Sequence, residues 1–474
     1  MEERINASVL DALPQTDEAK CGALLRAELD SSCVKLVVLD DDPTGVQTVH
    51  DVSVYTDWTY ESVFSGFREE NRLFFILTNS RSFTAEQTRR VHADIARAAA
   101  RASRETGKEY VLVSRGDSTL RGHYPLETET LRAVTEAEQG VKMDGEILCP
   151  FFFEGGRYTL ADTHYVRSGE ELIPAAKTEF ARDATFGYAH SNLREYIEEK
   201  TGGACRASEV VSISIEELRR CDIDAVTAKL CAAQDYTRFV VNAASYADVK
   251  LFAAAVYRAL AAGKRFIFRT AASLVRELGG VSARPLLTRG ELMADGCGNG
   301  GVIVVGSHTE KTTRQLQELR KLPGIEFVEF NSDLVTDEAA FTAETQRVRR
   351  AIEAAIRSGR TAAAYTCRRE LVIPGDTPES ALLRSVKISD AVQSLVGGLE
   401  VRPAFVLAKG GITSSDVGTK ALGVKRATVL GQICPGVPVW RTGGESRFPG
   451  IPYIIFPGNV GSDATLREAV EKLL

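Results

Sequence analysis

The chain alternates short runs of apolar residues with longer stretches in which apolar residues recur at helical spacing. In the first half, the apolar runs predict strands at 35–40, 73–78, 110–114, 146–149, 238–242 and 265–269. Helical spacing predicts helices between them, for example at 84–105 and 126–138. Continuous apolar strands separated by helices are typical of a parallel sheet with helices on both faces.

The second half repeats this pattern. Apolar runs predict strands at 302–306, 326–330, 362–366, 404–408, 427–431 and 453–456, with helices at 309–321, 337–357, 378–397, 415–422 and 462–474. Between the halves, residues 279–301 are rich in glycine and lack sustained apolar periodicity, so we place a domain boundary near 285–300. We therefore predict an α/β protein of two domains, 1–285 and 300–474, each a mostly parallel sheet flanked by helices, with an active site in the cleft between them.

Composition narrows the classes of partner. The formal net charge is −6, with 44% hydrophobic and 26% charged residues, which argues against a nucleic-acid binder and against global disorder. Nine cysteines without close pairing indicate neither a disulfide framework nor a zinc site, and no residue is assigned as a metal ligand. No apolar run reaches the roughly 18–20 residues of a membrane span, and the N-terminus does not read as a signal peptide. We expect a cytoplasmic protein without a membrane partner.

Because ligands bind at the carboxyl ends of strands in open α/β sheets, the residues after each strand carry the chemistry. The first predicted strand runs into Asp40-Asp41-Asp42-Pro43-Thr44-Gly45. Three adjacent carboxylates repel one another, so stability does not favour them. We interpret Asp42 or Asp41 as a general base, or as a ligand for Mg2+ held through water. The alternative is a simple turn, since Asp, Pro and Gly all favour turns.

The next two strand ends are rich in arginine and hydroxyl groups. One carries Asn79 and Arg81, and the other carries Arg115, Asp117, Ser118 and Arg121. Arginine binds carboxylate or phosphate oxygens with two hydrogen bonds, while Asp and hydroxyl groups suit the hydroxyls of a polyol. These loops predict a site for a small anionic hydroxy compound. A helix N-terminus with a capping hydroxyl is the structural alternative.

A further turn after the strand at 146–149 could add Arg157 to this site. Asp117 is the reserve candidate for the base. Thr44 and Gly45 are counted among the residues that bind the substrate.

Glycine turns end three strands of the second half, at Gly306-Ser307, at Lys409-Gly410-Gly411-Ile412-Thr413 and at Gly458-Asn459-Val460-Gly461. Backbone N–H groups at such turns bind phosphate. One such turn alone is usually structural, but three in one domain favour a nucleotide site. The P-loop pattern fails, because Val305 and Glu310 stand where it needs glycine, and no dinucleotide fingerprint follows a first strand.

Several of these segments, in order along the chain, resemble the four-carbon acid sugar kinase family, also known as domain of unknown function 1537. The segment 41–45 is similar to the family's Asp-Asp-x-Thr-Gly and the segment 117–122 to its Asp-Ser-Thr-x-Arg-Gly. Further matches are Gly156-Arg157 with 164–166, the segment 177–183, and the three glycine turns.

The resemblance implies an ATP-dependent kinase acting on a four-carbon sugar acid such as threonate, erythronate or a 3-oxo-tetronate. It implies a substrate site in the first domain and ATP with Mg2+ in the second. The nucleotide contacts would fall on Ser307, Lys409, Gly410, Gly411, Ile412, Thr413, Gly458, Asn459 and Gly461. This chain differs from the family where Ile412 replaces a frequent acidic residue and where Pro457 precedes the last turn.

Two other functions stay open on the residues alone. One is a two-domain hydroxy-acid dehydrogenase, against which the missing glycine fingerprint argues, and the other is a sugar-acid sensor without catalysis. The sequence leaves the oligomeric state open, with a homodimer as one option. Because a protein of net charge −6 would here bind two anions, its positive potential must be local, at Arg81, Arg115, Arg121 and Lys409 and at helix N-termini.

Overall fold

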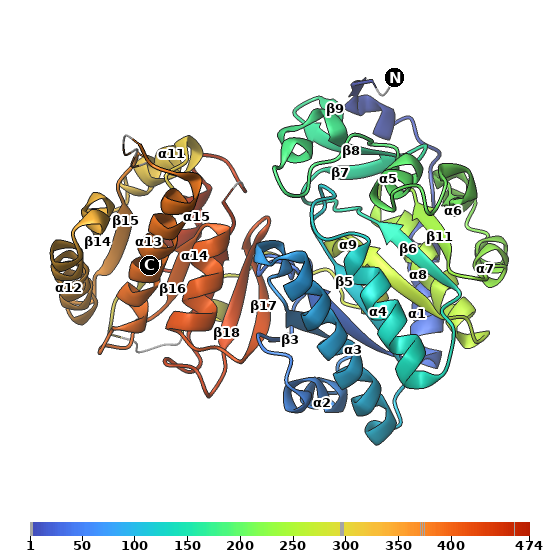
Figure 1. The fold of residues 1–474 in the computed structure, drawn as a ribbon, viewed down its shortest axis with the longest axis horizontal. Helices are drawn as coiled ribbons and strands as arrows, with labels where there is room; N and C mark the ends of the chain where they lie inside the picture. Colours follow the sequence, from blue (N-terminus) through green and yellow to red (C-terminus); the bar gives the residue numbers. More distant parts are fainter. Residues whose placement is uncertain (1–2, 294–297, 370, 372, 374, 459) are drawn as a thin grey trace. The chain divides into compact units, whose positions relative to one another are not determined.

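A computed structural model describes residues 3–293, 298–369, 371, 373, 375–458 and 460–474. The chain folds into two compact units. Unit 1 holds residues 1–48 and 57–283, and unit 2 holds residues 49–56 and 284–474. Each unit contains its own sheet and helices (Figure 1).

Unit 1 is built on a parallel sheet with the strand order β10-β11-β6-β12-β5-β2-β4. Its strands are β2 (Lys35–Asp40), β4 (Leu73–Leu77), β5 (Tyr110–Arg115), β6 (Gly145–Cys149), β10 (Val211–Ile213), β11 (Thr237–Val241) and β12 (Phe266–Thr270). Every residue of β2, β4, β6 and β12 is buried. Burial on both faces is why these strands read as unbroken apolar runs.

Helices cover both faces of this sheet (Figure 1). On one face α3 packs beside α4, and on the other α8 packs beside α1. The α-helices of unit 1 are α1 (Glu18–Ser31), α2 (Tyr60–Arg68), α3 (Ala85–Thr106), α4 (Leu126–Gln139), α5 (Leu193–Lys200), α6 (Ile215–Arg219), α7 (Ile223–Cys231), α8 (Tyr246–Ala261) and α9 (Ala272–Leu278). Short 3-10 turns are η1 (Ala7–Leu10), η2 (Ser80–Ser82), η3 (Ala175–Lys177), η4 (Glu179–Arg182) and η5 (Ala207–Glu209).

A small antiparallel sheet is inserted after β6. Its order is β1-β9-β8-β7, with β1 (Ile5–Asn6), β7 (Arg157–Leu160), β8 (Thr163–Ser168) and β9 (Glu171–Pro174). β7 carries Arg157 at its first position, so this insertion delivers one of the predicted substrate residues.

Unit 2 has a mixed sheet with the order β3-β17-β18-β19-β16-β13-β15-β14. The five strands from β19 to β14 are parallel, whereas β3, β17 and β18 run antiparallel to their neighbours in this unit. Its strands are β3 (Val52–Tyr55), β13 (Val302–Val305), β14 (Ile325–Phe330), β15 (Thr361–Thr366), β16 (Val406–Lys409), β17 (Arg426–Cys434), β18 (Val437–Thr442) and β19 (Pro452–Phe456).

The helices of unit 2 also form two groups, α11 with α15 and α12 with α13 and α14. They are α10 (Arg289–Leu292), α11 (Glu310–Leu319), α12 (Glu338–Arg357), α13 (Pro378–Gly397), α14 (Gly411–Asp416) and α15 (Thr465–Glu471), with a 3-10 turn η6 (Ser332–Thr336) and a π-helical turn η7 (Val417–Ala421).

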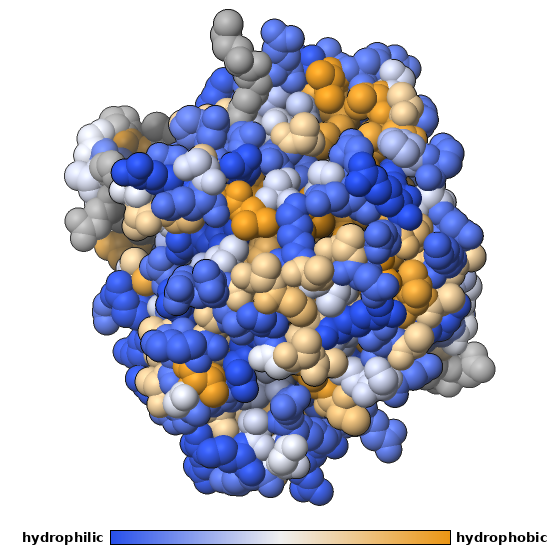
Figure 2. Space-filling model, turned by 90° about the vertical axis from the view of Figure 1, so that its right-hand side faces the viewer, coloured by the Kyte–Doolittle hydropathy of each residue, from blue (hydrophilic) through white to orange (hydrophobic). Residues whose placement is uncertain are grey.

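Hydrophilic residues dominate the face drawn in Figure 2, and apolar residues appear there in small separate groups. None of the helices within the described ranges is long and apolar enough to cross a membrane.

The predicted fold class is confirmed: this is an α/β protein with a mostly parallel sheet flanked by helices. All twelve predicted strands occur, with ends shifted by a few residues. The apolar pattern missed the antiparallel strands β7, β8, β9 and β18, and it did not indicate that residues 49–56 join unit 2 through β3.

Candidate functional site

The three consecutive aspartates lie at the carboxyl end of β2, which lies between β5 and β4 in the unit 1 sheet. Asp40 closes the strand, and Asp40 and Asp41 are buried. The Asp42 side chain keeps 19% of its surface exposed, against 3% for Asp41. Asp42 accepts hydrogen bonds from the backbone N–H (2.8 Å) and the hydroxyl of Thr44, as an Asx turn requires. The turn and the carboxylate site predicted from the sequence are therefore the same structure.

Arg81 lies among three carboxylates. Its Nη2 is 2.5 Å from Asp42 Oδ2, its Nε is 3.3 Å from Asp41 Oδ2, and its Nη1 is 3.7 Å from Asp117 Oδ1. Asn79 precedes it in the left-handed backbone region (φ 57°), and this turn brings Arg81 back over the end of β2. One guanidinium thus joins the ends of three strands.

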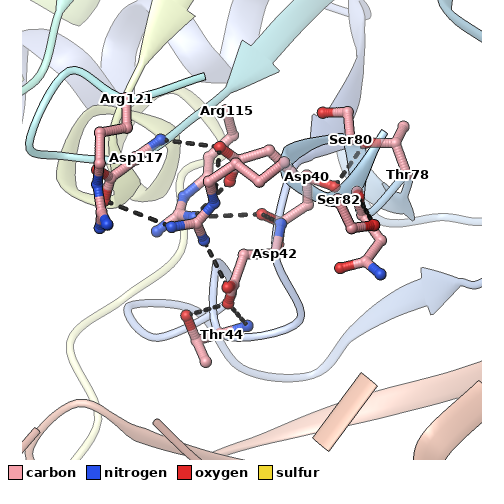
Figure 3. Close-up of polar contacts among 12 residues, drawn as sticks. Asp40, Asp42, Thr44, Thr78, Ser80, Ser82, Arg115, Asp117 and Arg121 are labelled. Atoms are coloured by element: carbon pink, nitrogen blue, oxygen red, sulfur yellow. Dashed lines mark hydrogen bonds and ion pairs between the residues drawn. The ribbon is translucent and has the colours of Figure 1, made fainter. Parts of the chain in front are cut away.

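The end of β5 completes this group, which we call the carboxylate–arginine cluster (Asp40, Asp41, Asp42, Arg81, Arg115, Asp117 and Arg121; Figure 3). Arg115 Nη1 lies 3.2 Å from Asp40 Oδ1 and 3.6 Å from Asp41 Oδ1. Arg121 Nε donates to Asp117 Oδ2 at 2.8 Å, and the Asp117 backbone N–H donates to Asp41 Oδ2 at 3.1 Å.

Close packing at the cluster explains why a glycine follows Thr44. A Cβ at Gly45 would stand 1.9 Å from Asp40 Oδ1, so any larger residue must displace that buried carboxylate. Gly45 is thus a packing requirement of the Asp40 side chain, and its predicted contact with substrate stays a prediction.

The environment separates the pKa values of the aspartates. Burial raises the pKa of Asp40 to about 8 and that of Asp41 to about 6, although nearby guanidiniums oppose the shift. Burial is also the largest single influence on Asp42 and Asp117, but Arg81 together with Thr44 at Asp42, and Arg81 together with Arg121 at Asp117, outweighs it and holds both pKa values below their usual range. At neutral pH the cluster therefore contains a protonated Asp40 beside ionised Asp42 and Asp117.

Two cluster neighbours were missed by sequence reasoning. Arg269, near the end of β12, lies 3.4 Å from Glu127 of α4 and donates to the Arg121 carbonyl at 2.9 Å. The sequence could have indicated Arg269, because it is the last residue of the predicted strand at 265–269. Candidate site residues were assigned only after the earlier strands of this half. Glu127 lies within a helix and not at a strand end, so its position in the sequence did not indicate a role in the site.

Ser118 and His164 connect the cluster to the inserted sheet. His164 Nε2 donates to the Ser118 carbonyl at 2.8 Å, and its Nδ1 lies 2.9 Å from the Thr159 hydroxyl. Burial lowers the pKa of His164 to about 4, so the ring is neutral and holds the 118–121 loop in place.

Arg157 differs from the other arginines of this site. Its guanidinium donates to the Gly155 carbonyl, its Nε is buried without a hydrogen-bond partner, and it forms no ion pair within the described residues. Both Arg157 and Arg121 face the Phe180 ring, at 5.8 and 5.0 Å from its centroid. An unpaired, partly buried guanidinium beside an aromatic ring is suited to bind an anionic ligand.

Unit 2 contains a separate site, a cavity of about 450 Å³ that we call the glycine-lined cavity. Strand ends supply one wall, with Gly306 to Thr309 after β13, Thr366 and Cys367 at β15, Gly410 to Thr413 after β16, and Gly458 after β19. The opposite wall comes largely from α13, with Arg384, Ser385, Ile388, Ser389 and Val392. Polar strand ends together with the apolar side chains of Ile388 and Val392 on α13 suit a ligand with a phosphate end and a flat apolar end.

Glycine is required at the strand-end wall. Gly410 has φ 117°, a backbone conformation that other residues rarely adopt, and it precedes the first turn of α14. The Ile412 side chain is 71% exposed at this turn. Of the predicted nucleotide residues, Ser307, Gly410, Gly411, Ile412, Thr413 and Gly458 line the cavity, whereas Lys409 and Gly461 do not, and Asn459 lies outside the described residues.

Lys409 is fully buried behind this wall. Its Nζ donates to the carbonyls of Pro457 and Gly458, both at 2.9 Å, and lies 4.6 Å from the centroid of the Phe456 ring. Within the described ranges, no group of three or more His, Cys, Asp or Glu side chains is arranged to hold a metal ion.

Comparison with known proteins assigns a class to each unit. Residues 36–278 match the family described as a sugar-binding N-terminal domain, and residues 302–466 match the one described as a nucleotide-binding C-terminal domain. The carboxylate–arginine cluster lies in the first range and the glycine-lined cavity in the second. The molecule is thus a two-domain protein that combines a sugar-binding with a nucleotide-binding domain. The chain belongs to the four-carbon acid sugar kinase family, also known as domain of unknown function 1537.

Solved structures share the fold. A Haemophilus influenzae protein of that family, HI1011, matches with 16% identity and a TM-score of 0.62, covering 92% of this chain and all of its own. A Salmonella typhimurium LT2 protein with a provisional tRNA synthase designation matches with 16% identity and a TM-score of 0.66, covering 94% of this chain and all of its own. The comparison with curated proteins found no match.

Proposed function

We propose that this protein is an ATP-dependent kinase that phosphorylates a hydroxyl group of a four-carbon sugar acid. The observation that carries the proposal is the pairing of two sites in one chain. A carboxylate–arginine cluster lies in the sugar-binding domain, and a glycine-lined cavity lies in the nucleotide-binding domain. Phosphoryl transfer needs an acceptor hydroxyl, a phosphate donor and charge neutralisation, and little covalent chemistry from the protein.

Asp42 is the best candidate to accept the proton of the acceptor hydroxyl. Its carboxylate is the most exposed of the three candidates, with 19% against 3% for Asp41 and 12% for Asp117. Its lowered pKa keeps it ionised at neutral pH. Both oxygens of Asp117 already face cations, with Arg81 near Oδ1 and Arg121 bound to Oδ2, so Asp117 serves better to hold these two arginines.

Arg157 is the best candidate to bind the carboxylate of the acid. Arg81 and Arg115 face the ionised carboxylates of Asp41 and Asp42, so their charge is largely neutralised within the protein. Arg157 has no carboxylate partner among the described residues and keeps a buried, unpartnered Nε. A ligand carboxylate would supply the missing partner.

In unit 2, the turns at Gly306 and Gly410 are the candidates to hold the nucleotide phosphates, and α13 would contact the base. Mg2+ bound with ATP would neutralise phosphate charge. Because no carboxylate lines the cavity within the described residues, such an ion would meet serine and threonine hydroxyls of the lining, among them those of Ser307, Thr309 and Thr413.

The test is turnover. The purified protein is mixed with ATP and Mg2+ and a panel of threonates, erythronates and 3-oxo-tetronates, and ADP release is followed. Asp42→Asn should lower kcat by about 10²- to 10⁴-fold, the usual contribution of a general base. Asp30→Asn, which changes an exposed aspartate of α1, should leave turnover unchanged.

Arg157→Met adds a test of substrate class. It should raise KM for the acid at least tenfold, because a charge-assisted contact is lost, and should change KM little for a sugar alcohol of equal length. No ADP release above background with any acid would contradict the proposal. Full activity of Asp42→Asn would instead refute only the assignment of the base.

A further inference from the structure

Lys409 is a buried cation that contacts neutral groups. Its side chain is fully buried, and its Nζ donates to two backbone carbonyls, those of Pro457 and Gly458. It makes no ion pair with a carboxylate within the described ranges. A buried ammonium without a carboxylate carries a desolvation cost that two carbonyls only partly offset.

The charged groups around Lys409 make this cost larger. Lys311 on α11 and Arg368 after β15 are the charged neighbours that act on it, and both are cationic. Arg368 is itself partly buried, donates to the Ser307 carbonyl at 2.6 Å, and has a buried Nη1 without a hydrogen-bond partner. Lys409, Lys311 and Arg368 thus lie close to the wall of the glycine-lined cavity, and neither Lys409 nor Arg368 forms an ion pair with a carboxylate of the described residues.

The position of Lys409 connects it to that cavity through the backbone. It immediately precedes Gly410 and Gly411, and one of its two acceptors is the carbonyl of Gly458; all three glycines line the cavity. We infer that Lys409 is a positioning residue that ties the two glycine turns together and receives its counter-charge from the phosphates of a bound nucleotide. This inference rests on the proposed nucleotide site and goes beyond it, since it makes nucleotide binding depend on the charge of a residue that the nucleotide does not touch.

If Lys409 receives its counter-charge from the nucleotide, nucleotide binding must be coupled to proton uptake by Lys409. A purely structural role of Lys409 would not produce this coupling. In the empty protein, burial and the nearby Lys311 and Arg368 lower the pKa of Lys409 to about 7. Phosphates in the cavity favour the charged form and raise that pKa. Above about pH 7, nucleotide binding must therefore be accompanied by uptake of a proton, and affinity must fall as the pH rises, by at most tenfold per pH unit.

The experiment is titration calorimetry of ADP into the full chain at about pH 8, in buffers of different ionisation enthalpy. The slope of the observed enthalpy against the buffer's ionisation enthalpy gives the number of protons taken up. We expect wild-type protein to take up between about half a proton and one proton per ADP. Lys409→Arg, which stays charged at every accessible pH, should bind ADP with a slope near zero.

Two further variants complete the test. Lys409→Met should weaken ADP binding at least tenfold at about pH 7, because the positive charge is removed. Lys472→Met is the matched control, since Lys472 also donates to a backbone carbonyl, that of Ile433, but does not line the cavity. It should keep the wild-type affinity and the wild-type slope.

The outcomes separate the two claims. A wild-type slope of zero would overturn the inference about Lys409 while ADP binding stands. A Lys409→Arg slope equal to that of wild type would overturn it as well, because the proton would then be taken up by another group. A wild-type protein that binds no ADP at all would overturn the proposed function itself.

Discussion

Removing the guanidinium of Arg81 should destabilise unit 1 strongly, because three carboxylates depend on it. Its nitrogens lie 2.5 Å from Asp42, 3.3 Å from Asp41 and 3.7 Å from Asp117. At an effective dielectric constant of about 20, the gross attraction at these distances is on the order of 15 kcal/mol, most of which offsets the desolvation of the four groups. The measurable loss is smaller: removing one partner of a buried ion pair costs about 3–5 kcal/mol, and we expect Arg81→Met to fall in that range.

The assay uses the two tryptophans of the chain, one in each unit. Trp58 lies in unit 1 and Trp440 in unit 2, so Trp58 fluorescence in a Trp440→Phe background reports the unfolding of unit 1 in urea. Arg89→Met is the matched control. Arg89 is 55% exposed and pairs with Glu86 one turn away on α3, an arrangement that contributes less than about 0.5 kcal/mol.

The pH dependence gives a second, independent check. In wild-type protein Arg81 lowers the pKa values of Asp42 and Asp117, which stabilises unit 1 above about pH 4, and this contribution is lost as the pH falls through the folded-state pKa values. Without Arg81, burial raises both pKa values instead, and stability must then fall as the pH rises above about 4. The difference between Arg81→Met and wild type should therefore be larger at about pH 8 than at about pH 5. A difference below about 1 kcal/mol at both pH values would refute this account of the cluster.

Two further predictions concern unit 1. Burial raises the pKa of Asp40 to about 8, so at neutral pH Asp40 must bind a proton when the chain folds. Asp40→Asn removes this requirement and should stabilise unit 1 by roughly 1–3 kcal/mol at about pH 7, with a smaller gain at about pH 5. A loss of stability at both pH values would contradict the assigned protonation of Asp40. The sulfurs of Cys21 and Cys221 lie 3.3 Å apart, so oxidation with diamide should join them in a disulfide that peptide mapping detects and dithiothreitol reverses. Mapping that finds both thiols free, after other cysteines have reacted, would contradict this geometry.

The sequence predicted those parts of the fold that are buried on both faces. β2, β4 and β6 are buried along their whole length, and apart from Lys35, Asp40 and Glu146 every position is apolar or small, so the apolar runs stand out in the sequence. β8 has the mixed pattern of a strand in a small exposed sheet, with two exposed residues at its end, and no run of apolar residues marks it. β3 pairs with β17 more than 350 residues further along the chain, and local periodicity contains no information about so distant a partner.

The sequence predicted those residues of the candidate site that directly follow a strand. Asp42, Arg81 and Asp117 follow three different strands, yet they meet because the carboxyl ends of adjacent parallel strands lie at one edge of the sheet. The α13 wall of the cavity was not predicted, because helix positions such as Ile388 and Val392 look like ordinary core residues. Whether a basic side chain faces a carboxylate or a ligand is also decided by tertiary contacts alone.

Whether a basic side chain faces a carboxylate or a ligand determines how this acidic protein can bind two anions. From the sequence, the positive potential is expected at Arg81, Arg115, Arg121 and Lys409. In the folded chain the three arginines face ionised aspartates, so their charge serves mainly to hold those carboxylates at the sheet edge. Among the arginines predicted to bind substrate in unit 1, Arg157, delivered by an inserted strand, has no carboxylate partner in the described ranges, and in unit 2 the corresponding cation is Lys409, which acts through backbone carbonyls. If ligand charge is the missing partner in both places, each unit should become more stable when its ligand binds, in proportion to the free energy of binding.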